Sequence, residues 1–331
     1  MALSGLRILG RTPKSTPARD TVIFFSSDVH GSERCWLKFL NAATAYGASV
    51  LIMGGDITGK GIVPIVRLGS AQYQVDFLGR RSLVDEEGLG EAKKRIRFNG
   101  FYPYVCDPAE VAALDSQTHL DGVFRKLISE QISRWMEIAA DRLAPQQVAC
   151  FVMPGNDDEF FVDEVLERAS YVVNPDMRVV DVGDYQLLSC SWVPPTPWAS
   201  PRECSEEELG DRLNELASTL DLSRPTIMSL HSPPYRTGLD DAPQLNEDLS
   251  VAKSAGQTKI VPVGSLAVRS FIERVQPLVA LHGHIHESRG VKKLGATVCI
   301  NPGSSYSEGV LDGCIVTLRG GAVRSTQLVR G

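Results

Sequence analysis

Five of the six histidines in this chain cluster in three short motifs, and two further motifs add carboxylate and amide side chains. The histidine motifs are Ser27-Asp28-Val29-His30, Leu230-His231-Ser232-Pro233-Pro234 and His282-Gly283-His284-Ile285-His286. The other two are Gly54-Gly55-Asp56 and Pro154-Gly155-Asn156-Asp157-Asp158. Imidazole, carboxylate and amide oxygen together suit Mn²⁺, Fe²⁺ or Zn²⁺ better than Ca²⁺. The residue types therefore predict a centre that binds divalent metal ions.

The spacing within the motifs supports the same interpretation. If the backbone is still extended at Asp28 and His30, the two side chains stand at positions i and i+2 and point to the same side. The same reasoning applies to His284 and His286. The seven cysteines lie outside these motifs, which argues against a closed structural zinc site.

The segments that precede the motifs are typical of buried strands. Each motif follows an apolar run that is nearly continuous rather than alternating, as in strands covered on both faces. These runs, with one more near the C-terminus, are Thr21–Phe25, Ser49–Met53, Val148–Met153, Thr226–Leu230, Leu278–Leu281 and Ala296–Ile300. Helices are predicted between them at Glu33–Tyr46, Glu159–Ala169, Ser205–Thr219 and Gly264–Val275. This alternation predicts an α/β domain, in which strand exits meet at one ligand-binding crevice.

Taken in order, the motifs Asp-x-His, Gly-Asp, Gly-Asn-x-Asp, a lone His after a strand and Gly-His-x-His resemble the calcineurin-like metallophosphoesterase family. The resemblance runs from Asp28 to His286, and Asn301-Pro302-Gly303-Ser304 is similar to a stretch of the family's smaller bacterial and archaeal phosphodiesterases. It implies a four-layer α/β/β/α sandwich of two mixed sheets with helices outside. We therefore expect a metallophosphoesterase domain over residues 21–331.

The resemblance also implies a ligand set for two divalent metal ions (Mn, Fe or Zn). Asp28, His30 and His286 would bind one ion, Asn156, His231 and His284 would bind the other, and Asp56 would bridge the pair. The implied reaction is hydrolysis of a phosphoester by in-line attack of a metal-bridging hydroxide. The C-terminal motif favours a phosphodiester. The alternatives are a phosphomonoesterase, a pyrophosphate hydrolase, a nucleic-acid-processing enzyme, and a catalytically weak binding or scaffold protein on the same fold.

The residue after Asn156 departs from the family pattern, which usually has His there. In this chain it is Asp157, and a carboxylate beside a phosphate is repulsive unless it is protonated or turned away. Unless the leaving group is a good one, it takes a proton from Asp157 or from His282, and these two residues are candidate catalytic residues. His284 is the third candidate catalytic residue. His282 also has a structural interpretation. Asp158 is expected either to hydrogen-bond a ligand histidine or to stand at a helix N-terminus.

Residues from about 59 to 146 interrupt the strand–helix alternation and are interpreted as an insertion. Two strand-like pieces, Ile62–Leu68 and Gln72–Leu78, come before a polar helical stretch and an amphipathic helix at about Leu120–Leu143. Since the insertion begins directly after Asp56, we expect it to pack near the metal crevice. Its basic residues either recruit a phosphate-bearing substrate or form a solvated helix face; they are Lys93, Lys94, Arg95 and Arg97.

Composition sets the remaining expectations. The net charge of −6 disfavours a surface that tracks nucleic acid, so a small phosphoester is the expected substrate and nucleic acid is not. Seven widely spaced cysteines without a CxxC pair suit reduced thiols in the cytoplasm. No segment has the length and apolar character of a membrane span. Residues 1–20 are predicted to be a flexible N-terminal segment, and the sequence does not indicate the oligomeric state.

Overall fold

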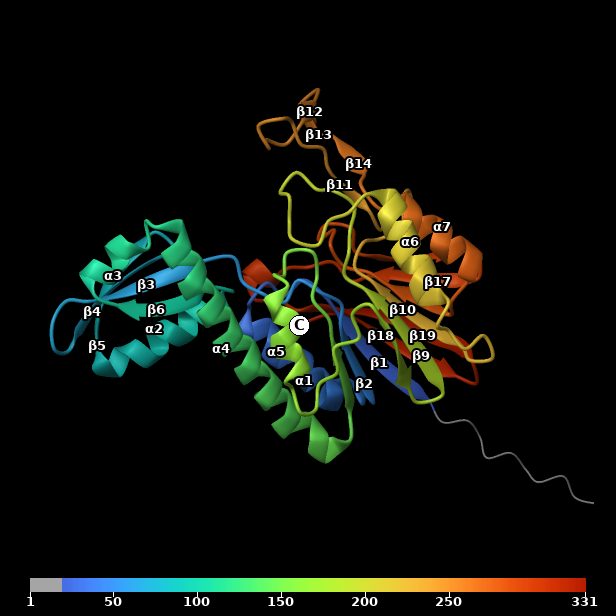
Figure 1. The fold of residues 1–331 in the computed structure, drawn as a ribbon, viewed down its shortest axis with the longest axis horizontal. Helices are drawn as coiled ribbons and strands as arrows, with labels where there is room; N and C mark the ends of the chain where they lie inside the picture. Colours follow the sequence, from blue (N-terminus) through green and yellow to red (C-terminus); the bar gives the residue numbers. More distant parts are fainter. Residues whose placement is uncertain (1–19) are drawn as a thin grey trace, which may run out of the picture.

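Two mixed β-sheets packed face to face form the framework of the computed structural model, which describes residues 20–331 (Figure 1). The segment predicted to be flexible, residues 1–20, lies outside the described residues except for Asp20. The first sheet has the strand order β19 (Ala322–Arg330), β18 (Asp312–Arg319), β1 (Thr21–Ser26), β2 (Val50–Met53) and β7 (Ala149–Val152). In it, β1, β2 and β7 are parallel, whereas β18 is antiparallel to both of its neighbours.

The second sheet has a parallel centre with an antiparallel strand at each edge. Its order is β16 (Gly290–Leu294), β17 (Thr297–Asn301), β15 (Val279–Leu281), β10 (Thr226–Leu230), β9 (Tyr185–Cys190) and β8 (Arg178–Val182). The four inner strands are parallel, and β16 and β8 are antiparallel to their neighbours. All six apolar runs chosen from the sequence are strands of these two sheets.

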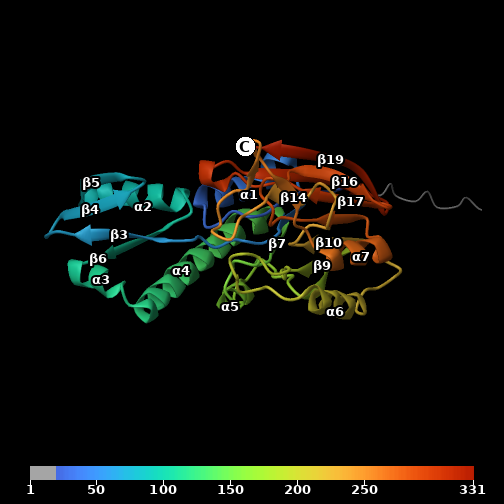
Figure 2. The same ribbon diagram turned by 90° about the horizontal axis from the view of Figure 1, so that it is seen from above.

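Helices cover the outer face of each sheet. The first sheet carries α1 (Glu33–Tyr46), α4 (Gln117–Leu143) and α5 (Phe161–Glu167), and the second carries α6 (Glu206–Ala217) and α7 (Leu266–Val275). Separate apolar clusters fill the spaces between helices and sheets, and a third cluster, which includes Phe25, Ile52 and Ile227, fills the space between the two sheets. The predicted α/β/β/α sandwich is therefore confirmed, and Figure 2 shows its layers from above.

The insertion has a sheet and an apolar core of its own. Its strand order is β5 (Arg80–Asp85), β4 (Gln72–Phe77), β3 (Ile62–Arg67) and β6 (Tyr102–Cys106), accompanied by α2 (Glu86–Phe98) and α3 (Pro108–Ala113). These elements stand to one side of the sandwich, and α4 leads back from them (Figure 1). The later part of α4 belongs to the outer helix layer, since Trp135 stacks on Trp36 with ring centroids 5.0 Å apart. The division into domains at residues 59 and 146 stays a prediction.

A second excursion lies between β10 and α7. It contains the short strand pairs β11 (Asp241–Pro243) with β14 (Ile260–Pro262), and β12 (Lys253–Ser254) with β13 (Gln257–Thr258). Two single-turn 3-10 helices complete the secondary structure of the described residues: η1 (Ala144–Gln146) and η2 (Tyr306–Glu308). Within residues 20–331, none of the helices has both the length and the apolar character that crossing a bilayer would require.

Candidate metal centre

The loops after β1, β2, β7, β10 and β15 meet at one end of the two sheets and bring all seven predicted ligands together. The parallel strands β1, β2 and β7 end on the same edge of the first sheet, and β10 and β15 end on the same edge of the second. Six of the seven side chains belong to residues that are buried or nearly so, and His286 is the most exposed at 29%. The strand exits therefore converge as predicted.

One group of atoms lies around Asp28, His30 and His286. The Nε2 atoms of the two histidines are 3.1 Å apart, and His286 Nε2 is 3.3 Å from Asp28 Oδ1. Each of the three residues offers a donor atom within 4.8 Å of the others, close enough to hold one metal ion. These are the three residues that the resemblance assigns to a single metal ion.

A second group lies around Asn156, His231 and His284. Asn156 Oδ1 is 3.0 Å from His231 Nε2 and 2.8 Å from His284 Nδ1. The Asn156 amide nitrogen donates to Ser200 Oγ and to Asp157 Oδ1, and these bonds fix its oxygen toward the two rings. His231 Nδ1 lies 2.8 Å from the carbonyl oxygen of Gly54, so this nitrogen carries the proton. His231 Nε2 points at Asn156 Oδ1, the oxygen that also faces His284 Nδ1.

Asp56 lies between the two groups. Its Oδ2 is 3.7 Å from His30 Nε2, and its Oδ1 is 3.5 Å from His231 Nε2. Asp56 Oδ1 also accepts a hydrogen bond of 3.0 Å from the backbone nitrogen of Asp157. A carboxylate with one oxygen toward each group is placed as a bridging ligand would be.

Four of the predicted ligands have left-handed backbone conformations, which non-glycine residues rarely adopt. Their φ angles are 57° at Asp28, 40° at His30, 50° at Asp56 and 67° at His284. The expectation that Asp28 and His30 continue an extended strand is therefore wrong, because β1 ends at Ser26. The side chains converge through strained loops, and such strain is characteristic of functional sites.

Three glycines allow the loops to approach one another closely. A Cβ atom at Gly155 would lie 2.2 Å from Asp56 Oδ1, and one at Gly55 would lie 2.5 Å from His231 Nδ1. A Cβ atom at Gly283 would lie 2.3 Å from Asp28 Oδ2. Each distance is far below van der Waals contact, so a side chain at any of these positions would displace a predicted ligand.

Asp158 holds two of the ligand loops together. Its carboxylate is fully buried and accepts four hydrogen bonds, from Ile57 N, Thr58 N, Thr58 Oγ1 and Gly155 N. It thus ties the loop of Asp56 to the loop of Asn156. Neither sequence interpretation of Asp158 describes this role, since it bonds no ligand histidine and α5 begins only at Phe161.

Asp157 is paired with a lysine that the sequence reasoning did not single out. Lys60 Nζ lies 2.8 Å from Asp157 Oδ2, and this same oxygen is 4.0 Å from His30 Nδ1. The ring of Tyr306 lies 4.6 Å from that of His30. Lys60 follows Asp56 by four residues in a Gly-Lys-Gly turn, and this closeness to a predicted ligand is the sequence feature that could have indicated Lys60. The ammonium of Lys60 offsets the negative charge of Asp157, the residue that departs from the pattern of the family that the sequence resembles.

The remaining histidines and the C-terminal motif have structural contacts. His282 is fully buried, and its Nδ1 bonds the carbonyl oxygens of Leu230 and Ser232, an arrangement that favours its structural interpretation. Asn301 donates to backbone carbonyls that include those of Gly283 and Ile285, which shapes the loop bearing His284. His119 is exposed on α4.

Burial and neighbouring charges push the pKa values of the site apart. Burial raises the pKa of Asp56 to about 6, and burial lowers that of His284 to about 3. Burial also opposes protonation of His231, but the carboxylates of Asp56 and Asp28 outweigh it and raise the pKa to about 10. The pKa of Asp28 is lowered despite burial, because His286 and His231 lie beside it. Opposed shifts of this kind mark a densely coupled polar site.

Comparisons with known proteins place the fold. No family model matches the chain. TT1561 of Thermus thermophilus has a solved structure that superposes with a TM-score of 0.51 at 16% identity, over 96% of this chain and 99% of that one. A second solved structure gives a TM-score of 0.53 at 14% identity, over 94% and 99% of the two chains. Both similarities concern the fold, which this chain shares with the two proteins along almost its whole length.

Two further similarities are to named proteins. An uncharacterized protein of Methanocaldococcus jannaschii, MJ1162, is 30% identical over 159 residues, which is 47% of this chain. The match spans 63% of that relative's length. YfcE, a phosphoesterase from E. coli, is also among the matching structures, with a TM-score of 0.31 and 11% identity over 92% of this chain and 98% of that one.

Proposed function

We propose that this chain is a dinuclear-metal-dependent phosphoesterase and that its favoured substrate is a phosphodiester. The proposal is supported by seven side chains of the expected types, brought together from five loops on a metallophosphoesterase-like fold. The ions suited to these nitrogen and oxygen donors are Mn²⁺, Fe²⁺ or Zn²⁺. Asp28, His30 and His286 would hold one ion, Asn156, His231 and His284 the other, and Asp56 would contact both.

The observation that carries the proposal is the meeting of Asn156 Oδ1 with His231 Nε2 and His284 Nδ1. With the His231 Nδ1 proton held by the Gly54 carbonyl, Nε2 is the nitrogen that a metal ion would take in place of its proton, and the amide oxygen offers lone pairs beside it. Burial keeps His284 neutral at physiological pH by lowering its pKa to about 3. The carboxylates of Asp56 and Asp28 favour a positive charge on His231 by raising its pKa to about 10, and a metal ion bound there would replace that charge. The donor set therefore fits a metal ion.

When bound, the two ions would supply Lewis-acid activation of water and charge stabilisation of the phosphoryl group. The residues of the chain supply orientation and charge around them. The Gly54 carbonyl holds the tautomer of His231, and the Asp157 backbone nitrogen orients Asp56. The ammonium of Lys60, which is 55% exposed, stands beside the centre and can bind a phosphoryl oxygen.

A catalytically weak scaffold protein is the second candidate, and Asp157 favours it. This carboxylate stands where the family usually has His, and its side chain is 27% exposed beside the centre. The pairing with Lys60 at 2.8 Å reduces its repulsion toward a phosphate. A phosphomonoesterase and a pyrophosphate hydrolase differ from the first proposal only in substrate, so the same assay separates them.

The test combines metal content with hydrolysis of bis-p-nitrophenyl phosphate, p-nitrophenyl phosphate and pyrophosphate in added Mn²⁺. We expect about two metal ions per chain and fastest turnover of the diester, with activity lost in EDTA and restored by Mn²⁺. Fastest turnover of the monoester or of pyrophosphate would replace the diesterase proposal. Two bound ions without hydrolysis of any substrate would favour the scaffold protein.

Matched variants separate ligand loss from general damage. Asp56→Asn and His284→Ala each remove a predicted ligand, and we expect each to lower the metal content and to reduce turnover at least 100-fold. His119→Ala removes an exposed histidine on α4 and should change neither quantity. Full metal content in both ligand variants would overturn the assignment of the centre.

We further propose that the protein works in a reducing compartment such as the cytoplasm. All seven cysteines are free and buried, which supports this setting.

A further inference from the structure

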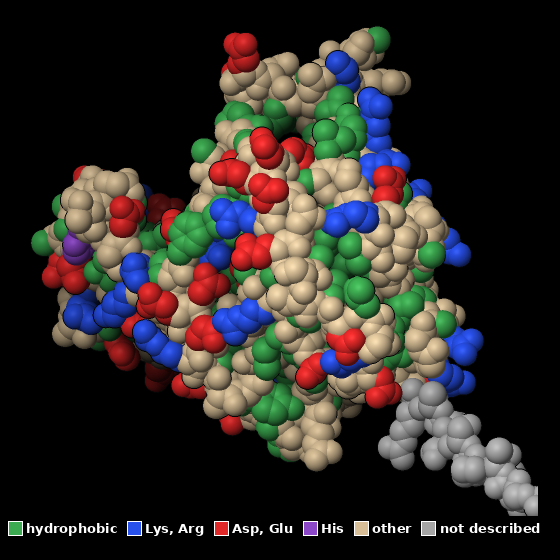
Figure 3. Space-filling view, turned by 45° about the vertical axis from the view of Figure 1, so that its right-hand side comes forward, with side chains coloured by type: hydrophobic (Ala, Val, Ile, Leu, Met, Phe, Trp, Pro, Cys, Tyr) green, Lys and Arg blue, Asp and Glu red, His purple; other side chains and the backbone are tan. Residues whose placement is uncertain are grey.

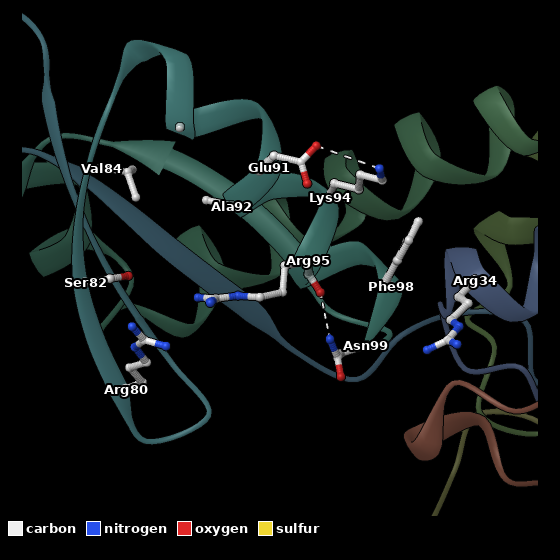
Figure 4. A pocket seen from close by; sticks show the side chains of 11 residues that line it. Arg34, Arg80, Ser82, Val84, Glu91, Ala92, Lys94, Arg95, Phe98 and Asn99 are labelled. Carbon is white, nitrogen blue, oxygen red and sulfur yellow. Dashed lines mark hydrogen bonds and ion pairs between the residues drawn. The ribbon is translucent and has the colours of Figure 1, made fainter.

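A groove with a volume of about 600 Å³ lies between the insertion and the sandwich (Figure 4). Strand β5 contributes Arg80 and Val84 to its lining, and α2 contributes Arg95 and Phe98. Arg34, in the first turn of α1, closes the end nearest the sandwich. A volume of this size accommodates a small organic ligand or part of a larger one.

The groove is strongly basic although the chain as a whole is acidic. Four cationic side chains line it (Arg34, Arg80, Lys94 and Arg95) against one carboxylate, Glu91, so the local charge is 4 − 1 = +3, compared with −6 for the chain. Lys94 pairs with Glu91 at 3.7 Å, whereas the three arginines form no salt bridge with any residue of the described part of the chain. Elsewhere, on the face shown in Figure 3, acidic and basic side chains are interspersed.

Apolar and aromatic surface lies among these cations. Val84, Ala92 and Phe98 line the groove, and Phe98 is only partly buried. The ammonium of Lys94 lies 5.6 Å from the centre of the Phe98 ring. Cations that surround an aromatic surface are the arrangement by which proteins bind single-stranded nucleic acid, since phosphates contact the cations and bases stack on the ring. A purely inorganic anion would leave the apolar part of the lining unused.

Backbone contacts connect the inner end of the groove to the metal centre. Ser32 Oγ donates to the carbonyl oxygen of Phe98 at 3.0 Å, and a Cβ atom at Gly100 would lie 2.4 Å from the carbonyl oxygen of His30. The Arg34 side chain lies against Gly309, which directly follows η2. That helix carries Tyr306, whose ring lies beside His30. The groove therefore begins at the loop that bears a predicted metal ligand.

We propose that the groove binds the phosphates and bases that flank the scissile bond of a short single-stranded oligonucleotide. This inference rests on the proposed phosphoesterase function, and it assigns the substrate class. Arg34, Arg80 and Arg95 contact successive phosphates, and Phe98 stacks against a base. The overall charge of −6 disfavours binding along a long nucleic acid, but three arginines in one groove suffice for a few nucleotides.

The test is the binding of fluorescein-labelled pentathymidylate to the full chain, measured by fluorescence anisotropy at 50 and 200 mM NaCl. Three phosphate contacts on a single strand give a salt exponent of about −2, so we expect the affinity to fall roughly 20-fold over this fourfold increase in salt. The triple variant Arg34→Gln, Arg80→Gln, Arg95→Gln should bind at least tenfold more weakly at 50 mM and should lose most of the salt dependence.

Arg81→Gln is the matched control. Arg81 neighbours Arg80 on β5, does not line the groove and pairs with Asp76 at 3.2 Å, so its loss should change the affinity less than twofold. The three groove arginines have exposed side chains, and we expect the thermal unfolding curve of the triple variant to match that of the wild type. Phe98→Leu keeps the charge and should weaken pentathymidylate, but not tripolyphosphate, several-fold.

Equal binding by wild type and triple variant would overturn the proposal. So would displacement of pentathymidylate by tripolyphosphate at equal concentration, because that result would assign the groove to inorganic polyanions. Since binding needs no turnover, failure of the phosphoesterase function appears separately, as intact arginine-dependent binding without hydrolysis of any ester. Cleavage of pentathymidylate by the wild type, slowed in the triple variant, would support both proposals together.

Discussion

Replacing Asp158 by Asn is the most direct test of how the ligand loops are held. The carboxylate is fully buried, and its two oxygens share four donors. Oδ2 accepts from Ile57 N at 3.0 Å and from Gly155 N at 2.7 Å, while Oδ1 accepts from Thr58 N at 2.8 Å and from Thr58 Oγ1 at 2.6 Å. In Asn, one oxygen becomes an NH₂ group, so two of the four donors face another donor in either orientation of the amide.

The expected cost follows from those two lost bonds. A hydrogen bond to a charged acceptor contributes about 1.5–3 kcal/mol, and its loss leaves a buried donor unpaired. Since the Thr58 hydroxyl can rotate to another acceptor, we expect Asp158→Asn to lower the free energy of unfolding by about 3–5 kcal/mol. This is a large part of the roughly 5–15 kcal/mol typical of a folded domain. Urea denaturation of the metal-free protein measures this loss of unfolding free energy.

Two further variants bracket the result. Thr58→Val removes only the hydroxyl bond to the carboxylate and should cost about 1.5–3 kcal/mol. Asp181→Asn changes a carboxylate that is 80% exposed and pairs with Arg224, so it should cost less than about 1 kcal/mol. If Asp158→Asn stays within about 1 kcal/mol of the wild type, Asp158 does not tie the two loops together and the reasoning is refuted.

Three further predictions concern the site and its surroundings. Gly283→Ala places a Cβ atom 2.3 Å from Asp28 Oδ2, so we expect metal binding measured by calorimetry to weaken at least tenfold. Lys60→Gln removes the cation beside Asp157, and we expect the KM for phosphoesters to rise about tenfold at unchanged metal content, by steady-state kinetics. Burial raises the pKa of Asp176 from 3.8 to about 6, so its stabilising proton is bound below about pH 4 and lost as the pH rises through 6. The free energy of unfolding should fall by up to about 3 kcal/mol over that interval, and Asp176→Asn should flatten the dependence in urea titrations from pH 4 to 7.

Each of these predictions has a control and a contrary outcome. Gly122→Ala, on α4 with open space around it, should leave metal binding intact, and equal binding by Gly283→Ala would contradict the crowding argument. Lys126→Gln alters a lysine paired only with Glu130 and should not change KM. An unchanged KM in Lys60→Gln would remove Lys60 from substrate binding. A pH dependence that survives Asp176→Asn would have to arise from other groups.

Much of the sandwich could be predicted because its strands are buried on both faces. A continuous apolar run such as Thr226–Leu230 is recognisable from the sequence alone, and the run coincides with β10. The edge strand β8 was not predicted, because it is short and its charged residues Arg178 and Asp181 interrupt the apolar run. Strands β12 and β13 have two residues each and are too short to show a periodic pattern of apolar residues.

The site could be predicted only as a set of residue types. The motifs placed Asp28 and His284 at strand exits, but periodicity could not reveal that both have positive φ angles. The roles of Lys60 and Asp158 depend on partners about 100 residues away in the sequence, so no local pattern indicated them. The basic run near Arg95 was visible, whereas its meeting with Arg34 required the fold.

The seven predicted ligands are divided between the two sheets, and this division has a mechanical consequence. Asp56 is attached to the first sheet and His231 to the second, and the apolar layer between the sheets fixes their separation. A truncation in that layer, such as Phe25→Ala or Ile227→Val, removes no polar atom of the site and would let one sheet shift against the other. This movement would change the distance between the ligands on the two sheets. The selectivity of the centre for metal ions therefore depends partly on the packing of the apolar side chains between the sheets.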